Sequence, residues 1–170
     1  MHRPTAEDCT PFYGRYIALV HDEPVLDTLE NLKTSSYDLF SKLTGEQAAH
    51  AYAEGKWTVK EVVGHLIDAE RTFAYRILAF SRGQAELPGF DENTYVARSA
   101  FNARTIQDLA LEFKTVREAN LYMLHALTED QLAATGIANG SKINVNTIVY
   151  IMAGHELHHL SILKDRYLIS

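Results

Sequence analysis

Cysteine is almost absent from this sequence: Cys9 is the only one among 170 residues. A single thiol cannot form an internal disulfide. No cysteine lies in the helical segments described below, so they lack the thiolate ligands that closed structural zinc sites commonly use. The low cysteine content therefore fits a reducing compartment and argues against a disulfide-stapled or cysteine-zinc fold.

Positive charge and long apolar stretches are also scarce. The chain has 16 Lys and Arg residues against 22 Asp and Glu residues, with a formal net charge of −6 and a pI near 5.7. This balance provides no basic face for nucleic acid or an anionic membrane surface. No apolar run approaches the roughly 20 residues of a membrane span, and the N-terminus lacks the apolar core of a signal peptide. We expect a cytoplasmic protein that acts on a small-molecule substrate, with no nucleic-acid or membrane partner.

Helical signals dominate the chain instead. Amphipathic patterns of helical period cover four long segments, residues 24–43, 58–82, 105–124 and 144–167. The second segment opens with a capping box, Thr58 with Glu61, and similar boxes at Thr44 and Thr128 predict short accessory helices. The pattern predicts an all-α fold, an up-and-down four-helix bundle.

The remaining segments carry weaker patterns. Residues 1–21 hold two of the four prolines and predict an extended N-terminal arm, which leaves residues 22–170 as a single domain. Residues 84–102 predict a long loop with a short helical piece near Tyr95, and loops of this length are often functional. Residues 136–144 predict a turn, and no segment shows the alternation of a strand.

Three of the eight histidines stand close together in the last helical pattern, at His155, His158 and His159. Each helical residue advances about 100°, so His155 and His159 lie about 40° apart on one apolar face. His65 occupies the apolar stripe of the second long helix in the same way. Packing alone would favour leucine or isoleucine at such positions, so these histidines require an explanation.

Facing helices of a bundle can bring His65, His155 and His159 together. Neutral imidazole is a good ligand for zinc, nickel, copper or iron, and three imidazoles leave one coordination position open for water or substrate. The alternative is that each is an ordinary core or surface histidine with satisfied hydrogen bonds. We expect His158 to lie at the flank of the helix, either exposed or in a subunit contact.

Two carboxylates near these histidines are candidates for catalysis. Residues 155–159 match the H-E-x-x-H signature of zincin proteases, in which the glutamate is the general base. The segment after His159 contains no histidine to act as the usual third ligand, so we do not expect a zincin. Glu156 remains a candidate base, with a solvated helix-face residue as the alternative. Asp68 is a second candidate, either as a base or as an acceptor that orients the His65 imidazole, with a surface ion pair as the alternative.

Three segments carry motifs that occur together in a known family. Residues 56–71 read KWTVKEVVGHLIDAER, residues 87–91 read LPGFD, and residues 153–160 read AGHELHHL. They resemble the second-helix signature, the following loop and the last-helix signature of the DinB-like superfamily, in its YfiT-like branch. The resemblance extends in the right order over about residues 24–168.

This resemblance implies a four-helix bundle with one divalent metal ion held by His65, His155 and His159. Nickel or zinc is the expected ion, iron is a further candidate, and a homodimer is the expected assembly. The implied activity is that of a metal-dependent hydrolase, in which the open position activates water. A second version is an S-transferase that binds a low-molecular-weight thiol, such as bacillithiol or mycothiol, as the thiolate. The alternative is a non-catalytic protein that binds a metal or a small ligand.

Overall fold

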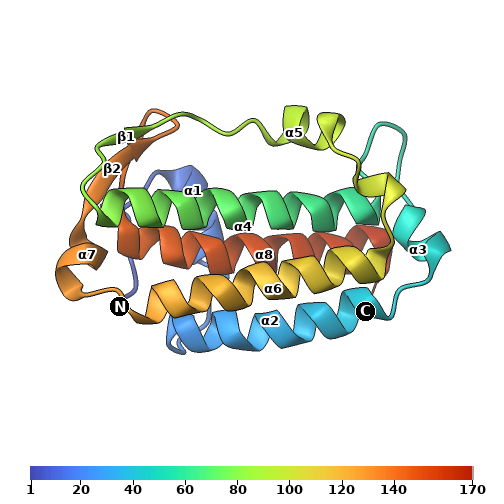
Figure 1. Ribbon diagram of the computed structural model, residues 1–170, viewed down its shortest axis with the longest axis horizontal. Coiled ribbons are helices and arrows are strands. Elements are labelled where there is room, and N and C mark those ends of the chain that lie inside the picture. Colours follow the sequence, from blue (N-terminus) through green and yellow to red (C-terminus); the bar gives the residue numbers. More distant parts are fainter. Residues whose placement is uncertain (170) are drawn as a thin grey trace.

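Four long helices form the body of the molecule, a computed structural model that describes residues 1–169 (Figure 1). They are α2 (Val25–Ser41), α4 (Val59–Ser81), α6 (Ile106–His125) and α8 (Val145–Tyr167). Helix α2 packs against α6, α6 against α4, and α4 against α8, with their apolar faces turned inward. The predicted four-helix bundle is confirmed. Within residues 1–169, no helix is both long and apolar enough to cross a membrane.

Local capping determines where several of these helices begin. Thr58 accepts a hydrogen bond from the Glu61 backbone while the Glu61 side chain bonds back to Thr58, as the sequence predicts. The same reciprocal box opens α3 (Gly45–Ala49) and α7 (Glu129–Ala133). Helix α4 ends just before Gly83, whose φ of 90° is left-handed and suits glycine. The helix positions therefore follow from local sequence signals.

The connectivity differs from a simple up-and-down bundle. The Thr58 hydroxyl at the start of α4 donates to Asn102 Oδ1 at 2.7 Å, just before the start of α6. Helices α4 and α6 therefore begin at the same end and run in parallel. The connection between them travels the length of the bundle, and carries β1 (Glu86–Leu87), α5 (Glu92–Arg98) and the 3-10 turn η1 (Phe101–Ala103) (Figure 1). We call residues 82–105 the crossover; α5 is the short helix predicted near Tyr95.

A small sheet corrects the prediction that the chain contains no strands. Strands β2 (Thr135–Ala138) and β3 (Ser141–Asn144) form an antiparallel hairpin, and β1 pairs in parallel with β2. The turn is Asn139-Gly140, with φ values of 52° and 72°. Strands of two to four residues are too short to show alternation. The Asn-Gly pair is a hairpin signal that the sequence did carry.

The N-terminal segment also differs from the extended arm that was predicted. Residues Pro11–Ile17 form helix α1, which packs on α8. The contact is close because Gly154 of α8 has no side chain: a methyl group there would collide with the carbonyl oxygen of Tyr16. Arg3 fastens the segment further, donating from Nη1 to the carbonyl of Val20 at 2.8 Å. The N-terminal segment is therefore part of the folded structure.

A buried ion-pair network crosses the centre of the bundle. Arg117 of α6 donates from Nε and Nη2 to the two carboxylate oxygens of Glu70 on α4, each at 2.8 Å. The same Nη2 donates to Glu156 of α8 at 2.8 Å, and Nη1 donates to the Leu29 carbonyl of α2 at 3.3 Å. Burial opposes the charge of Arg117, but the two carboxylates outweigh it and raise the guanidinium pKa. One side chain thus links all four long helices.

We expect Arg117→Met to lower the free energy of unfolding by about 3–5 kcal/mol, because it leaves two buried carboxylates without their counter-charge. Urea denaturation measures this loss. Arg166→Met is the matched control, since Arg166 is exposed on α8 and its loss should change stability by less than about 0.5 kcal/mol. Similar stability of the two variants would show that the network does not hold the helices together.

We expect Gly154→Ala to destabilise the protein by about 1–3 kcal/mol, because the added methyl group forces α1 away from α8. Thermal unfolding and proteolysis of the N-terminal segment measure the effect. Gly14→Ala on α1 is the control: its methyl group meets no atom within 4 Å and should be neutral or stabilising. Unchanged protection of the N-terminal segment in Gly154→Ala would contradict the close packing described here.

Candidate metal centre

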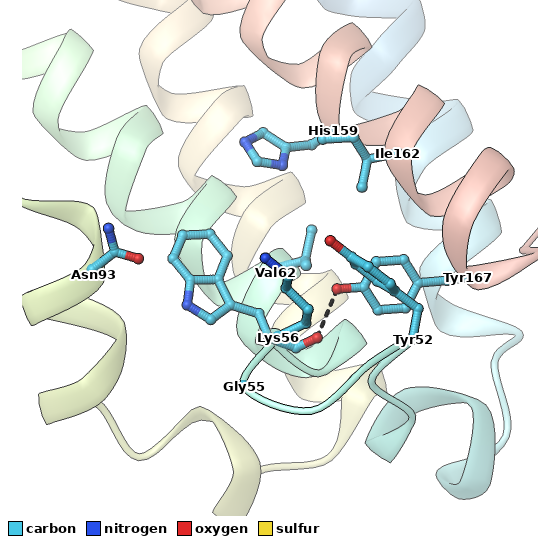
Figure 2. Close-up of a pocket in the computed structure, with 9 residues that line it drawn as sticks. Tyr52, Gly55, Lys56, Val62, Asn93, His159, Ile162 and Tyr167 are labelled. Carbon is cyan, nitrogen blue, oxygen red and sulfur yellow. Dashed lines mark hydrogen bonds between the residues drawn. The ribbon is translucent and has the colours of Figure 1, made fainter.

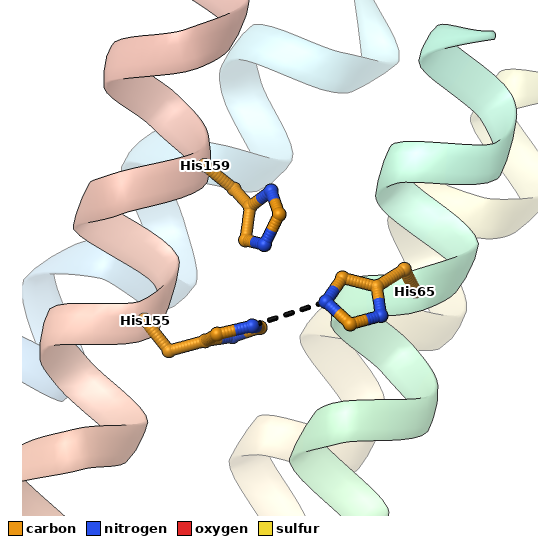
Figure 3. A group of neighbouring side chains, drawn as sticks. All are labelled: His65, His155 and His159. Atoms are coloured by element: carbon orange, nitrogen blue, oxygen red, sulfur yellow. Dashed lines mark hydrogen bonds between the residues drawn. The ribbon is translucent and has the colours of Figure 1, made fainter. Parts of the chain in front are cut away.

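Three histidines meet between α4 and α8 (Figure 3). His65 comes from α4, whereas His155 and His159 stand one turn apart on α8. Their potential ligand nitrogens all lie within 4.8 Å of one another. The Nε2 atoms of His65 and His155 face each other at 3.0 Å. The structure thus brings together the three residues that the apolar stripes selected.

Burial keeps these imidazoles uncharged. It lowers the pKa of His65 to about 4 and that of His159 to about 3. The pKa of His155 is also well below its usual value, first because of burial and then because of the neighbouring histidines. No carboxylate among residues 1–169 forms an ion pair or a hydrogen bond with any of the three rings. Neutral rings have lone pairs available for a metal ion.

The hydrogen bonding of the cluster is not that of a satisfied core. Within residues 1–169, Nδ1 of His65 and Nδ1 of His159 are buried without a hydrogen-bond partner. Orphaned buried nitrogens are costly, and a packed core normally avoids them. The nitrogen of His65 that faces His155 is Nε2, so an ion between the rings would use that lone pair and leave Nδ1 of His65 as an N–H. Zinc, nickel and iron all accept imidazole donors, and the three residues fit such an ion because their ligand nitrogens converge.

A cavity of about 310 Å³ adjoins the histidines. Six of its fourteen lining residues are Phe, Tyr or Trp, namely Phe12, Tyr13, Tyr16, Trp57, Phe73 and Phe90. The Trp57 ring lies 5.0 Å from the His65 ring, between centroids, and Tyr16 lies 5.5 Å from His155. Phe90 of the crossover stacks parallel to His65 at 6.3 Å. Sequence reasoning missed Tyr16 because it assigned no helix to the N-terminal segment.

A second cavity of about 260 Å³ lies on another side of His159 (Figure 2). Trp57 and His159 border both cavities. Tyr52 and Tyr167 form part of the far wall, and the Tyr167 hydroxyl donates to the Trp57 carbonyl at 2.6 Å. Burial raises the pKa of Tyr167 to about 12, so this hydroxyl keeps its proton. His159 thus borders both cavities, whereas His65 and His155 line only the first.

The two carboxylate candidates lie elsewhere. Glu156 is buried, not solvated: one oxygen accepts from Arg117 and the other from the Ser36 hydroxyl at 2.5 Å. Asp68 is half-buried and does not orient His65, whose Nδ1 has no partner within residues 1–169. His158 is partly exposed at the cavity wall, with its ring 5.3 Å from that of Tyr16. Neither carboxylate belongs to the histidine cluster.

Comparisons with known proteins agree with this architecture. The chain is 26% identical over 148 residues to a protein of Oceanobacillus iheyensis named "Putative metal-dependent hydrolase", with 84% of each chain covered. YfiT from Bacillus subtilis, described as "a probable metal-dependent hydrolase with an unusual four-helix bundle topology", superposes with a TM-score of 0.69. The two are 17% identical, over 99% of this chain and 95% of that one.

A second solved structure shows the same fold. YjoA, a DinB-like protein of Bacillus subtilis, superposes with a TM-score of 0.59 at 21% identity, over 82% of this chain and 85% of that one. The sequence model of the DinB superfamily matches residues 28–163, which include all four long helices in whole or in large part and all three clustered histidines. By this match, and by the bundle and the histidines that the superfamily resemblance implied, the chain belongs to the DinB superfamily.

Proposed function

We propose that this chain is a metal-dependent hydrolase of a small molecule, with one divalent ion held by His65, His155 and His159. The observation that carries the proposal is the convergence of three uncharged imidazoles, two buried and one partly buried, at the wall of a cavity. The relative from Oceanobacillus iheyensis is named "Putative metal-dependent hydrolase" and YfiT is described as "a probable metal-dependent hydrolase", which supports the same activity. Nickel and zinc are the ions we expect, with iron as a further candidate.

The metal ion, the aromatic wall and Glu92 would have different roles in hydrolysis. A bound ion supplies Lewis acidity, which lowers the pKa of a coordinated water. The imidazoles are held in place by two packed helices, so little reorganisation is needed to bind the ion. Trp57, Phe73 and Phe90 exclude bulk water and provide an apolar surface for the substrate. Among the described residues lining this cavity, Glu92 is the one carboxylate, so we assign proton acceptance to it.

A thiol S-transferase is the second candidate, and two observations favour it. The two cavities meet at Trp57 and His159, which gives space for a thiol and a second substrate on different sides of the cluster. Neither Glu156 nor Asp68 is hydrogen-bonded to the cluster as a base. A thiol whose pKa has been lowered needs no such base, because it is already a nucleophile at neutral pH. A low-molecular-weight thiol is the corresponding co-substrate.

Three further expectations remain part of the proposal. We propose a homodimer, a cytoplasmic location and a single domain over residues 22–170, against which the N-terminal segment packs. These rest on composition and on the family resemblance. Because α1 packs on α8, the segment before residue 22 contributes Tyr16 to the cavity wall. A truncated chain would therefore lack part of the proposed site.

We expect the protein purified without an affinity tag to contain about one equivalent of divalent metal per chain, and the His155→Ala, His159→Ala double variant to contain almost none. Elemental analysis measures both. Chelation should also lower the free energy of unfolding of the wild type. The loss should be about 3–4 kcal/mol when the free metal concentration before chelation is 100- to 1,000-fold above Kd.

The matched control for metal binding is the His21→Ala, His125→Ala double variant, which removes two exposed imidazoles outside the cluster. It should keep its metal. A wild-type protein that stays metal-free after incubation with nickel, zinc and iron would refute the metal centre. Metal bound without any turnover would instead favour the non-catalytic binding protein.

We expect the metal-loaded protein to hydrolyse small ester or amide substrates without added thiol, and the His155→Ala, His159→Ala variant to be at least about 100-fold slower. A chromogenic substrate panel, run with and without a low-molecular-weight thiol, measures the rates. Hydrolysis that is independent of thiol supports the hydrolase. No hydrolysis, together with thiol transfer to an electrophile that requires the metal, would replace it with the S-transferase.

A further inference from the structure

Arg76 of α4 is a buried cation without a counter-ion. Its residue surface is 7% exposed, and no carboxylate of residues 1–169 forms an ion pair with it. Burial lowers the pKa of its guanidinium, and the group that opposes this effect is the Tyr13 hydroxyl. Arginine nonetheless stays charged in proteins. Arg76 is thus a largely covered cation that stands beside the Tyr13 hydroxyl and is paired with no carboxylate within residues 1–169.

The other buried arginine shows how this chain compensates such a charge when the role is structural. Arg117 is matched by two carboxylates and a backbone carbonyl within its own bundle. Covering a charge without an ionic partner is costly. A covered guanidinium that lines a cavity and has a tyrosine hydroxyl but no carboxylate beside it is a feature expected of an anion site.

The position of Arg76 connects it to the histidine cluster. It lines the same 310 Å³ cavity as His65, on the same helix and eleven positions further along, which places the two Cα atoms about 16 Å apart. Between them the cavity wall includes Ala69 and Phe73. A separation of eleven residues is close to three helical turns, so both positions are on one face of α4.

The cavity contains little other charge. Its histidines have lowered pKa values and are neutral, so Arg76 is the only cation among the described residues that line it. Glu92 is the single carboxylate there; it is exposed and forms no ion pair with Arg76. One guanidinium matches one carboxylate in charge and in planar, two-bond geometry. A phosphate dianion would leave a second charge in an apolar space.

We propose that Arg76 binds a carboxylate of the substrate, whose apolar or aromatic body lies along the aromatic wall while its reacting group reaches the histidine cluster. The substrate class is thus an aryl- or alkyl-substituted carboxylic acid with a second, reactive group at the far end. The placement of that reactive group rests on the proposed metal centre. The carboxylate site stands on Arg76 and the cavity alone.

The test compares 3-phenylpropionate with its uncharged amide, 3-phenylpropionamide, as probes of full-length protein. Trp57 is the only tryptophan and borders the cavity, so its fluorescence reports occupancy, and titration calorimetry gives Kd. We expect the acid to bind about 10- to 100-fold more tightly than the amide, the range typical of hydrogen bonds to a charged group. Arg76→Met should reduce this preference to less than about 3-fold on the same basis.

Arg82→Met is the matched control, because it removes the same charge from an exposed position just after α4. It should keep the preference for the acid. Arg76→Met should also unfold at a temperature no lower than the wild type, since it removes an uncompensated buried charge. Equal affinity of acid and amide for the wild type would overturn the proposal, and so would a preference that survives in Arg76→Met.

The same titrations on metal-loaded and chelated protein separate this proposal from the metal centre. A preference that depends on Arg76 in the chelated protein shows a carboxylate site that needs no ion. If that result came with no metal uptake, the proposed function would fail and the carboxylate site would stand. A different result would be a preference for the acid in the metal-loaded protein only, in both the wild type and Arg76→Met. The carboxylate would then bind the metal ion and not Arg76, and the proposal would be overturned.

Discussion

The buried charge of Arg117 is the constraint on which the arrangement of the helices depends. Its guanidinium is bonded to Glu70, Glu156 and the Leu29 carbonyl, so all four long helices must stand in one register to satisfy it. Glu156 follows His155 directly in the chain. By holding Glu156 toward the centre of the bundle, the network fixes the rotation of α8 and therefore directs His155 and His159 toward α4.

Within the part of the chain that the structure describes, buried polar groups are paired at the centre of the bundle but lack partners around the cavity. At the centre, Arg117 and its carboxylates compensate one another within hydrogen-bonding distance. Around the cavity, the buried Nδ1 atoms of His65 and His159 have no partner within residues 1–169, and Arg76 has no carboxylate. Within the same residues, buried unpartnered atoms also occur in the first turn of α8, at Asn146 Oδ1 and Thr147 Oγ1, so an unpaired group alone does not mark a site. The cavity differs from that turn because its unpaired groups stand beside a space that a ligand could fill.

Much of this structure is predictable from the sequence, and the features that are not predictable depend on contacts between residues far apart in the chain. Capping boxes such as Thr58 with Glu61 act within four residues, so they define helix starts without tertiary information. The histidine stripe is equally local. The parallel course of α4 and α6 depends on contacts across the chain, such as Thr58 with Asn102. Glu156 was considered a candidate base because a sequence does not show that Arg117, 39 positions away, would bind it.

The division of labour around the cavity follows from the same topology. His65 and Arg76 stand on α4, which is held rigidly by packing on α6 and α8. Phe90 and Tyr16 come from the crossover and from α1, which lie outside the four-helix core. Segments outside the core can change in length and sequence without disturbing the ion-pair network. Under the proposals made above, Arg76 and the histidine cluster would hold the two ends of a substrate, while the crossover and α1 would determine which body fits between them.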